Sequence, residues 1–113
     1  MSLQCAFRGS VQIFLFEKNF RLHLIIALIV LIFGIYVHLN ALEWVILLGF
    51  VCLVFVAEII NSCLERFLDS ALPFKNDKTK IIKDMAAGAV LVSSVFSAIA
   101  GLIIFLPKFF CIF

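Results

Sequence analysis

Three long apolar runs divide the chain, and each is long enough to cross a membrane as a helix. Residues 24–42 and 85–106 contain no Asp, Glu, Lys or Arg, and residues 44–64 contain a single acid, Glu58. Runs of about 20 residues match the ~30 Å of hydrocarbon in a bilayer at ~1.5 Å rise per residue. Lipid offers no partners to backbone groups, so all three runs are expected to be helical. The pattern predicts transmembrane helices over about residues 22–41, 43–68 and 79–106.

The first 20 residues follow a different pattern. The apolar positions of residues 11–16 are mixed with Arg8, Gln12 and Glu17, and the apolar run is too short for a cleavable signal. Such a mixture is typical of a helix that lies in the plane of the membrane surface. We therefore expect an amphipathic surface helix over about residues 5–20, within a single membrane-embedded domain that covers residues 1–113.

A regular row of polar residues marks the end of the second apolar run. At ~100° per residue, the row falls within about 100° of arc on one helix face. Its members are Glu58, Asn61, Ser62, Glu65 and Asp69. Ionisable groups inside a membrane are costly and face the interior of a bundle, so the row indicates a functional site. Hydrogen bonding between helices is the alternative interpretation, and it suits Asn61 and Ser62 as well as chemistry does.

The composition agrees with a membrane protein. The chain has 113 residues, of which 65% are hydrophobic and only 14% are charged. A soluble domain of this size could not bury so much apolar surface. The net charge of +2 is small, and no basic patch is interleaved with aromatic residues. We therefore expect the lipid bilayer as a partner and no nucleic acid.

The placement of basic residues predicts the orientation. They precede the first span or lie between the second and third, at Arg8, Lys18, Arg21, Arg66, Lys75, Lys78, Lys80 and Lys83. The link between the first two spans, residues 38–43, has neither Lys nor Arg. The positive-inside rule then places the N-terminus and the 66–84 loop in the cytoplasm, and the C-terminus outside.

Two helix starts carry local signals. Asn40 and Glu43 have the spacing of a capping box, which would begin the second span. Pro73, Asn76 and Asp77 predict a break after the second span, with the helix starting again near Lys78.

Charged groups from all three predicted spans gather at one membrane face. Glu17 precedes the first span, Glu65 and Asp69 end the second, and the pair Lys83-Asp84 begins the third. Glu58 would lie about 10 Å deeper than Glu65 along the helix axis. Mg²⁺ prefers one or two carboxylates with phosphate oxygens and water, and a carboxylate can take the proton of an attacking hydroxyl. These groups permit phosphoryl transfer at the height of lipid headgroups.

Three segments of the chain also resemble a known family. They are Glu17-Lys18-Asn19-Phe20-Arg21-Leu22-His23, Glu58-x-x-Asn61-Ser62-x-x-Glu65-x-x-x-Asp69, and Lys83-Asp84-Met85-Ala86-Ala87-Gly88-Ala89-Val90-Leu91. In order and spacing they resemble the prokaryotic diacylglycerol kinase family over about residues 11–106. The first and third segments are most similar to its undecaprenol kinase branch.

The resemblance implies a homotrimeric lipid kinase of a bacterial inner membrane that uses MgATP. Glu58 would be the catalytic base that faces the lipid hydroxyl, and Glu17 and Glu65 would bind the metal. These two glutamates, Lys83 and Asp84 would contact ATP, and Asn61 and Asp69 would support the polar cluster. The expected reaction is phosphorylation of undecaprenol to undecaprenyl phosphate.

Other functions remain open at this point. Diacylglycerol, phosphorylated to phosphatidic acid, is the alternative substrate. A small proton- or cation-coupled transporter with Glu58 as its carrier site is more remote, because the acids crowd toward one face instead of the midplane. A non-catalytic membrane subunit would leave the polar row and Lys83-Asp84 without explanation.

Overall fold

The structure of the chain, a computed structural model, describes residues 2–71 and 76–112. This part consists of α1 (Leu3–Phe16), α2 (Lys18–Tyr36), α3 (Ala41–Ala71) and α4 (Asp77–Ile112). The last three helices are long and apolar enough to span a membrane. The predicted fold class, an all-α membrane protein with three spans and an N-terminal helix, is confirmed.

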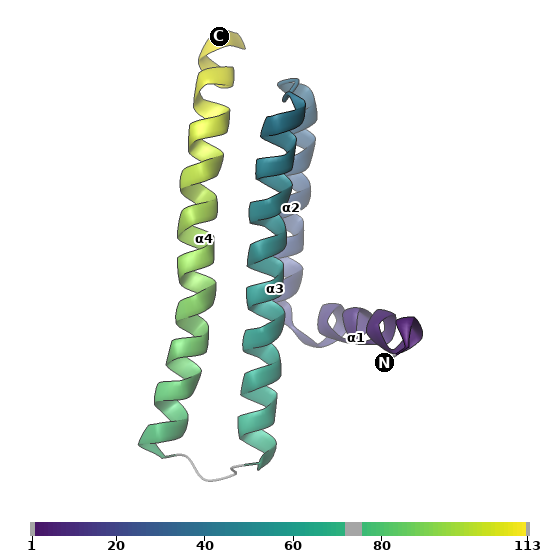
Figure 1. The fold of residues 1–113 in the computed structure, drawn as a ribbon, viewed down its shortest axis with the longest axis vertical. Helices are drawn as coiled ribbons and strands as arrows, with labels where there is room; N and C mark the ends of the chain where they lie inside the picture. The colour runs from purple at the N-terminus through teal and green to yellow at the C-terminus, as the bar shows by residue number, and fades with distance from the viewer. Residues whose placement is uncertain (1, 72–75, 113) are drawn as a thin grey trace.

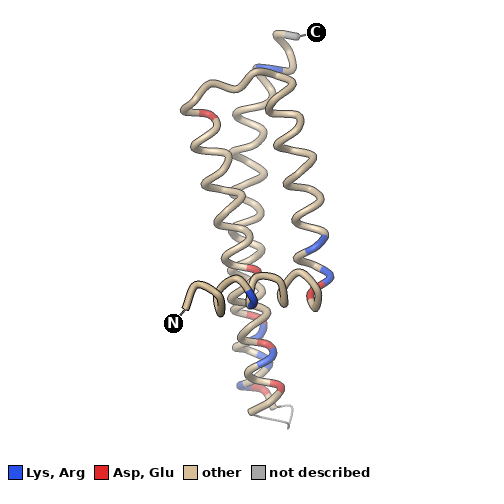
Figure 2. The backbone as a smooth tube through the Cα atoms, turned by 90° about the vertical axis from the view of Figure 1, so that its right-hand side faces the viewer, with Lys and Arg blue, Asp and Glu red and all other residues tan. Residues whose placement is uncertain are grey.

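The three long helices lie side by side, and α1 projects from them nearly at a right angle (Figure 1). Helices α3 and α4 are antiparallel and extend past the start of α2. We call the end that holds the start of α2, the end of α3 and the start of α4 the charged end. The opposite end, with the link from α2 to α3, is the turn end. Most Lys, Arg, Asp and Glu residues gather toward the charged end (Figure 2).

Helix α1 is shorter at its C-terminal side than the predicted surface helix. It ends at Phe16, because Glu17 takes an extended conformation (φ −112°, ψ 113°) and separates α1 from α2. Along α1 only Ile13 is buried, while the large apolar side chains Phe7, Leu15 and Phe16 are exposed. A helix with so much apolar surface outside the bundle suits the membrane interface.

The limits of the long helices also differ from the sequence expectation. Helix α2 ends at Tyr36, five residues before the predicted limit, because His38 adopts a left-handed conformation (φ 58°) in the link to α3. Helix α3 continues to Ala71, three residues past the predicted limit, and α4 begins at Asp77, close to the restart predicted near Lys78. The predicted break at Pro73 lies outside the described residues, as does Lys75.

The turn end holds the packed core. Val37, Leu39, Leu47 and Ile104 are buried together there. The Trp44 ring lies so close to Gly34 that a Cβ at position 34 would be 2.9 Å from it. Glycine is therefore required where α2 meets the start of α3.

Hydrogen bonds of the predicted kind begin α3 and α4. Asn40 N–H donates to Glu43 Oε1 (3.0 Å), and Glu43 N–H donates to Asn40 Oδ1 (2.9 Å), so the capping box is confirmed. Asn76 Oδ1 accepts from the Thr79 N–H (2.8 Å) and caps α4. Lys108 Nζ lies 3.2 Å from Glu43 Oε1 and joins α4 to the start of α3.

Candidate active site

The first three residues of the polar row of α3 face the inside of the molecule, whereas Glu65 is half-buried and Asp69 at the end of the row is exposed. Glu58, Asn61 and Ser62 are 4%, 9% and 2% exposed, whereas Ile60 and Phe67 on other faces are 60% and 64% exposed. Asn61 Nδ2 donates to Glu65 Oε1 one turn later (3.4 Å), and Asn61 Oδ1 is buried without a partner among the described residues. A buried carboxylate beside an unsatisfied buried amide is costly in an apolar environment, which is typical of a site that binds a ligand.

Glu58 has titratable neighbours from two further parts of the chain. His23 of α2, Glu65 of α3 and Glu17 all lie near enough to interact with it electrostatically. Three carboxylates and one imidazole therefore share a layer at the charged end. The structure brings together the three glutamates that the sequence indicated.

Glu17 reaches this layer from the break between α1 and α2. Its side chain makes no hydrogen bond to the start of α2 and instead contacts Arg66 of α3. Both Arg66 Nε and Arg66 Nη2 lie 3.0 Å from Glu17 Oε1. The Arg66 guanidinium also lies over the Phe16 ring, 5.4 Å from its centroid. One arginine thus ties the break between α1 and α2 to α3.

A second ion pair joins α3 to α4. Lys83 Nζ donates to Asp69 Oδ1, with the lysine side chain 30% exposed and the aspartate 66% exposed. Asp84, the next residue of α4, is exposed. Two of the four residues that the resemblance assigns to the nucleotide, Lys83 and Asp84, therefore lie at the start of α4, and Lys83 is bound there by Asp69 of α3.

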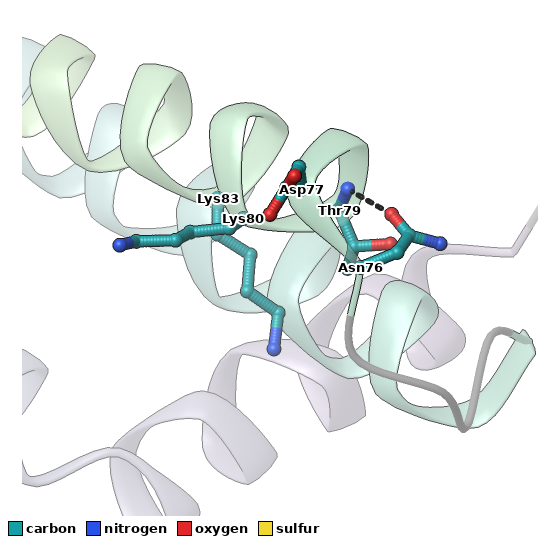
Figure 3. Close-up of a pocket in the computed structure, with 5 residues that line it drawn as sticks. All are labelled: Asn76, Asp77, Thr79, Lys80 and Lys83. Carbon is teal, nitrogen blue, oxygen red and sulfur yellow. Dashed lines mark hydrogen bonds between the residues drawn. The ribbon is translucent and has the colours of Figure 1, made fainter.

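An open hollow of about 390 Å³ lies at the start of α4. It is lined by Asn76, Asp77, Thr79, Lys80 and Lys83, and the two lysine side chains diverge from each other within it (Figure 3). Thr79 is 6% exposed, and its Oγ1 has no partner among the described residues. The hollow is a polar, solvent-open continuation of the charged end.

An apolar groove of about 770 Å³ runs from His23 toward the turn end, where Leu47 and Phe105 line it. Helices α2, α3 and α4 all contribute to it, for example through Phe33, Phe55 and Leu102. His23, a neighbour of Glu58, is among its lining residues, and Ser97 of the lining donates to the Phe50 carbonyl (3.3 Å). Apolar space thus reaches the carboxylate layer.

The carboxylates suit a divalent cation that takes only a few of its ligands from the protein. Among residues 2–71 and 76–112, no three His, Cys, Asp or Glu side chains converge as a metal-binding group. Mg²⁺ with a nucleotide needs only one or two carboxylates, because phosphate oxygens and water complete its shell. The carboxylates of this layer that could serve as ligands are Glu17, whose Oε1 contacts Arg66, and Glu65, whose Oε1 accepts from Asn61 Nδ2.

Two members of this arrangement were not assigned a site role from the sequence. In the sequence analysis, Arg66 enters only the prediction of orientation, and His23 enters only as part of a segment that resembles the family. No pattern within the sequence links Arg66 to Glu17, which lies 49 positions away. Helical spacing connects residues three or four apart, so a contact between helices leaves no such signal.

Comparison with known proteins shows the family of the chain. Residues 4–105 match the family model described as prokaryotic diacylglycerol kinase. The chain is 41% identical over 92 residues to an undecaprenol kinase of Bacillus subtilis. The aligned region covers 81% of this chain and 75% of that protein. It is 32% identical over 108 residues to a diacylglycerol kinase of Synechocystis. That aligned region covers 95% of this chain but only 62% of the Synechocystis protein. The chain belongs to the prokaryotic diacylglycerol kinase family, and its enzyme class is that of a lipid kinase.

Proposed function

We propose that this protein transfers the γ-phosphoryl group of MgATP to the hydroxyl of undecaprenol and produces undecaprenyl phosphate. The observation that carries the proposal is the buried Glu58 carboxylate, which lies near Glu17 and Glu65 and near His23, a residue that lines the apolar groove. The 41% identity to an undecaprenol kinase supports this choice of lipid.

In the proposed reaction, Glu58 accepts the proton of the lipid hydroxyl. The oxygen then forms a bond to the γ-phosphorus while the bond from that phosphorus to the β-bridging oxygen breaks, so ADP leaves. General base catalysis of this kind contributes about 10²- to 10⁴-fold to a rate. Burial at 4% exposure excludes competing water from the carboxylate.

Glu17 and Glu65 are the residues that would hold Mg²⁺. When bound, the ion would offset the negative charge of the ATP phosphates. Asn61 orients Glu65 by its hydrogen bond and so supports the same cluster. ATP as the donor follows from membership in a kinase family.

Lys83 and Asp84 are proposed to contact the nucleotide from the start of α4. The Lys83 ammonium can neutralise phosphate charge, and Asp69 limits where that ammonium lies. The open hollow beside Lys83 gives a water-soluble nucleotide room to approach from the charged end. The lipid would approach from the apolar side.

The proposed setting is a bacterial inner membrane with the charged end in the cytoplasm. The N-terminus and the link between α3 and α4 would be cytoplasmic and the C-terminus outside, as the distribution of basic residues predicts. We also propose a homotrimer. Many apolar side chains remain exposed on α2, α3 and α4, and a trimer would cover part of this surface.

The test is a phosphate-transfer assay on the purified protein in nanodiscs. Labelled ATP is supplied with undecaprenol or with diacylglycerol in matched membranes, and phosphorylated lipid is counted. Faster transfer to undecaprenol supports the proposal. Preference for diacylglycerol would favour the second candidate, which the similarity to the Synechocystis protein suggests. Ion flux without lipid phosphorylation would instead indicate a transporter.

We also propose that residues from neighbouring subunits combine in one active site, and this needs a separate experiment. Inactive variants that differ in the altered residue, such as E58Q and K83A, are mixed before reconstitution. Recovery of activity would show that subunits combine their residues in one site. Lack of recovery, with mixed oligomers confirmed by crosslinking, would place each complete site within one chain.

A further inference from the structure

The contact between Arg66 and Glu17 has a geometry that leaves part of the carboxylate unused. Arg66 Nε and Nη2 both approach Glu17 Oε1 at 3.0 Å. A forked pair would engage both carboxylate oxygens, but here Arg66 engages one. The second oxygen of Glu17 is left for another ligand.

The backbone does not orient Glu17 by itself. The residue lies at an extended position between two helices, and its side chain makes no capping bond to α2. Backbone hydrogen bonds tie Glu17 to Ile13 and to Arg21, but neither of them fixes the direction of its side chain. Arg66, on the continuous helix α3, supplies the fixed point.

The ring of Phe16 completes the support. The guanidinium lies 5.4 Å from its centroid, so the arginine plane is held by a residue of α1 while its nitrogens hold Glu17. Arg66 also follows Glu65 directly in α3. Its position is therefore coupled to the second carboxylate proposed for the metal.

We propose that Arg66 is a positioning residue, which fixes the Glu17 carboxylate beside α3 and leaves one oxygen available to a divalent cation. The inference rests on the proposed function, in which Glu17 and Glu65 hold the nucleotide-bound metal. Arg66 is 59% exposed, and an ion pair with so exposed a partner adds little to folding stability. Its effect should therefore appear in metal affinity and not in the fold.

The experiment compares R66A, R66K and K18A in the full chain in nanodiscs. Lys18 is an exposed cation next to Glu17 in the sequence, so K18A removes the same charge without removing the contact. Binding of Mn²⁺ is measured by electron paramagnetic resonance with a non-hydrolysable ATP analogue, and the Mg²⁺ dependence of lipid phosphorylation is measured in parallel. Circular dichroism checks the helix content of each variant.

We expect R66A to weaken Mn²⁺ binding and raise the half-saturating Mg²⁺ concentration about 10-fold, since loss of a residue that orients a metal ligand costs ~10–100-fold in affinity. The rate at saturating Mg²⁺ should stay near that of the wild type. R66K should be intermediate and K18A unchanged. In an E17Q background, R66A should cause no further loss.

Unchanged or tighter Mn²⁺ binding in R66A would overturn the inference, because Arg66 would then be neutral or a competitor of the metal. An equal loss in K18A would also overturn it, by showing that only local charge matters. If the wild type phosphorylates no lipid, the proposed function fails. The Mn²⁺ titration would still decide the role of Arg66.

Discussion

Lys83 of α4 donates to the carboxylate of Asp69 of α3, and the two residues belong to helices that are joined through the link after Ala71. The pair fixes the start of α4 against the end of α3, at the level where the nucleotide is proposed to bind. Asp69 was expected to support the polar cluster. In the structure, the group that Asp69 contacts is the ammonium of Lys83.

Asp69→Asn should raise the KM for ATP by up to about 5-fold, since an exposed ion pair contributes ~0.2–1 kcal/mol. The side chain keeps its shape, but Lys83 loses its charged partner. Initial rates over a range of ATP concentrations measure the effect. E43Q, which removes a carboxylate at the turn end, is the control. An unchanged KM would show that Asp69 does not position Lys83 for ATP.

Glu58→Gln should lower kcat by about 10²- to 10⁴-fold, the range that a general base contributes. The amide fills the same buried space but cannot take the hydroxyl proton. Nucleotide binding should persist, because Lys83 and Asp84 lie on another helix. Turnover measurements test the expected loss of kcat, and equilibrium binding of an ATP analogue tests whether nucleotide binding persists. A variant that keeps the wild-type rate would exclude Glu58 as the base.

Glu17→Gln and Glu65→Gln should each raise the half-saturating Mg²⁺ concentration, in parallel. Loss of one of two carboxylate ligands weakens the site, and Mg²⁺ depends on few protein ligands when phosphates are present. Full Mg²⁺ titrations of lipid phosphorylation provide the measurement. Chelation of the metal should abolish activity in every variant, and readdition should restore it. Two unchanged titrations would rule out this ligand pair.

Asn40→Ala should destabilise the protein by about 1 kcal/mol, the usual effect of losing an N-cap side chain. The Glu43 N–H would lose its partner, while the charged end would be untouched. Denaturation in mixed micelles, followed by circular dichroism, compares N40A with N40D, which retains a capping oxygen. Activity of folded N40A should match the wild type. Equal stability of all three proteins would mean that the box does not stabilise α3.

The positions of the helices were largely readable because lipid imposes a length and composition on each span. The capping box at Asn40 was also readable, since its partners are three residues apart and local in sequence. The break at Glu17 could not be predicted, because residues 16–18 contain neither Gly nor Pro. The continuation of α3 to Ala71 exceeds what a bilayer requires and depends on contacts with α4.

For the site, residue type carried most of the information. A glutamate such as Glu58 in an apolar run is expensive, so its burial toward other helices followed from the sequence. The neighbours of Glu58 could not be predicted from the sequence. The rotation and crossing angle of each helix decide whether His23 faces Glu58 and whether Arg66 reaches Glu17. Helix rotation and crossing angle result from many side-chain contacts together, and no short sequence motif encodes them.

The Trp44 ring against Gly34, with the buried residues around it, concentrates the tight packing far from the carboxylates. The charged end is joined mainly through exposed ion pairs, which tolerate replacement at little energetic cost. Substitutions of these surface ion pairs should therefore disturb the alignment of the helices less than substitutions in the packed turn end, where Gly34 and Trp44 meet.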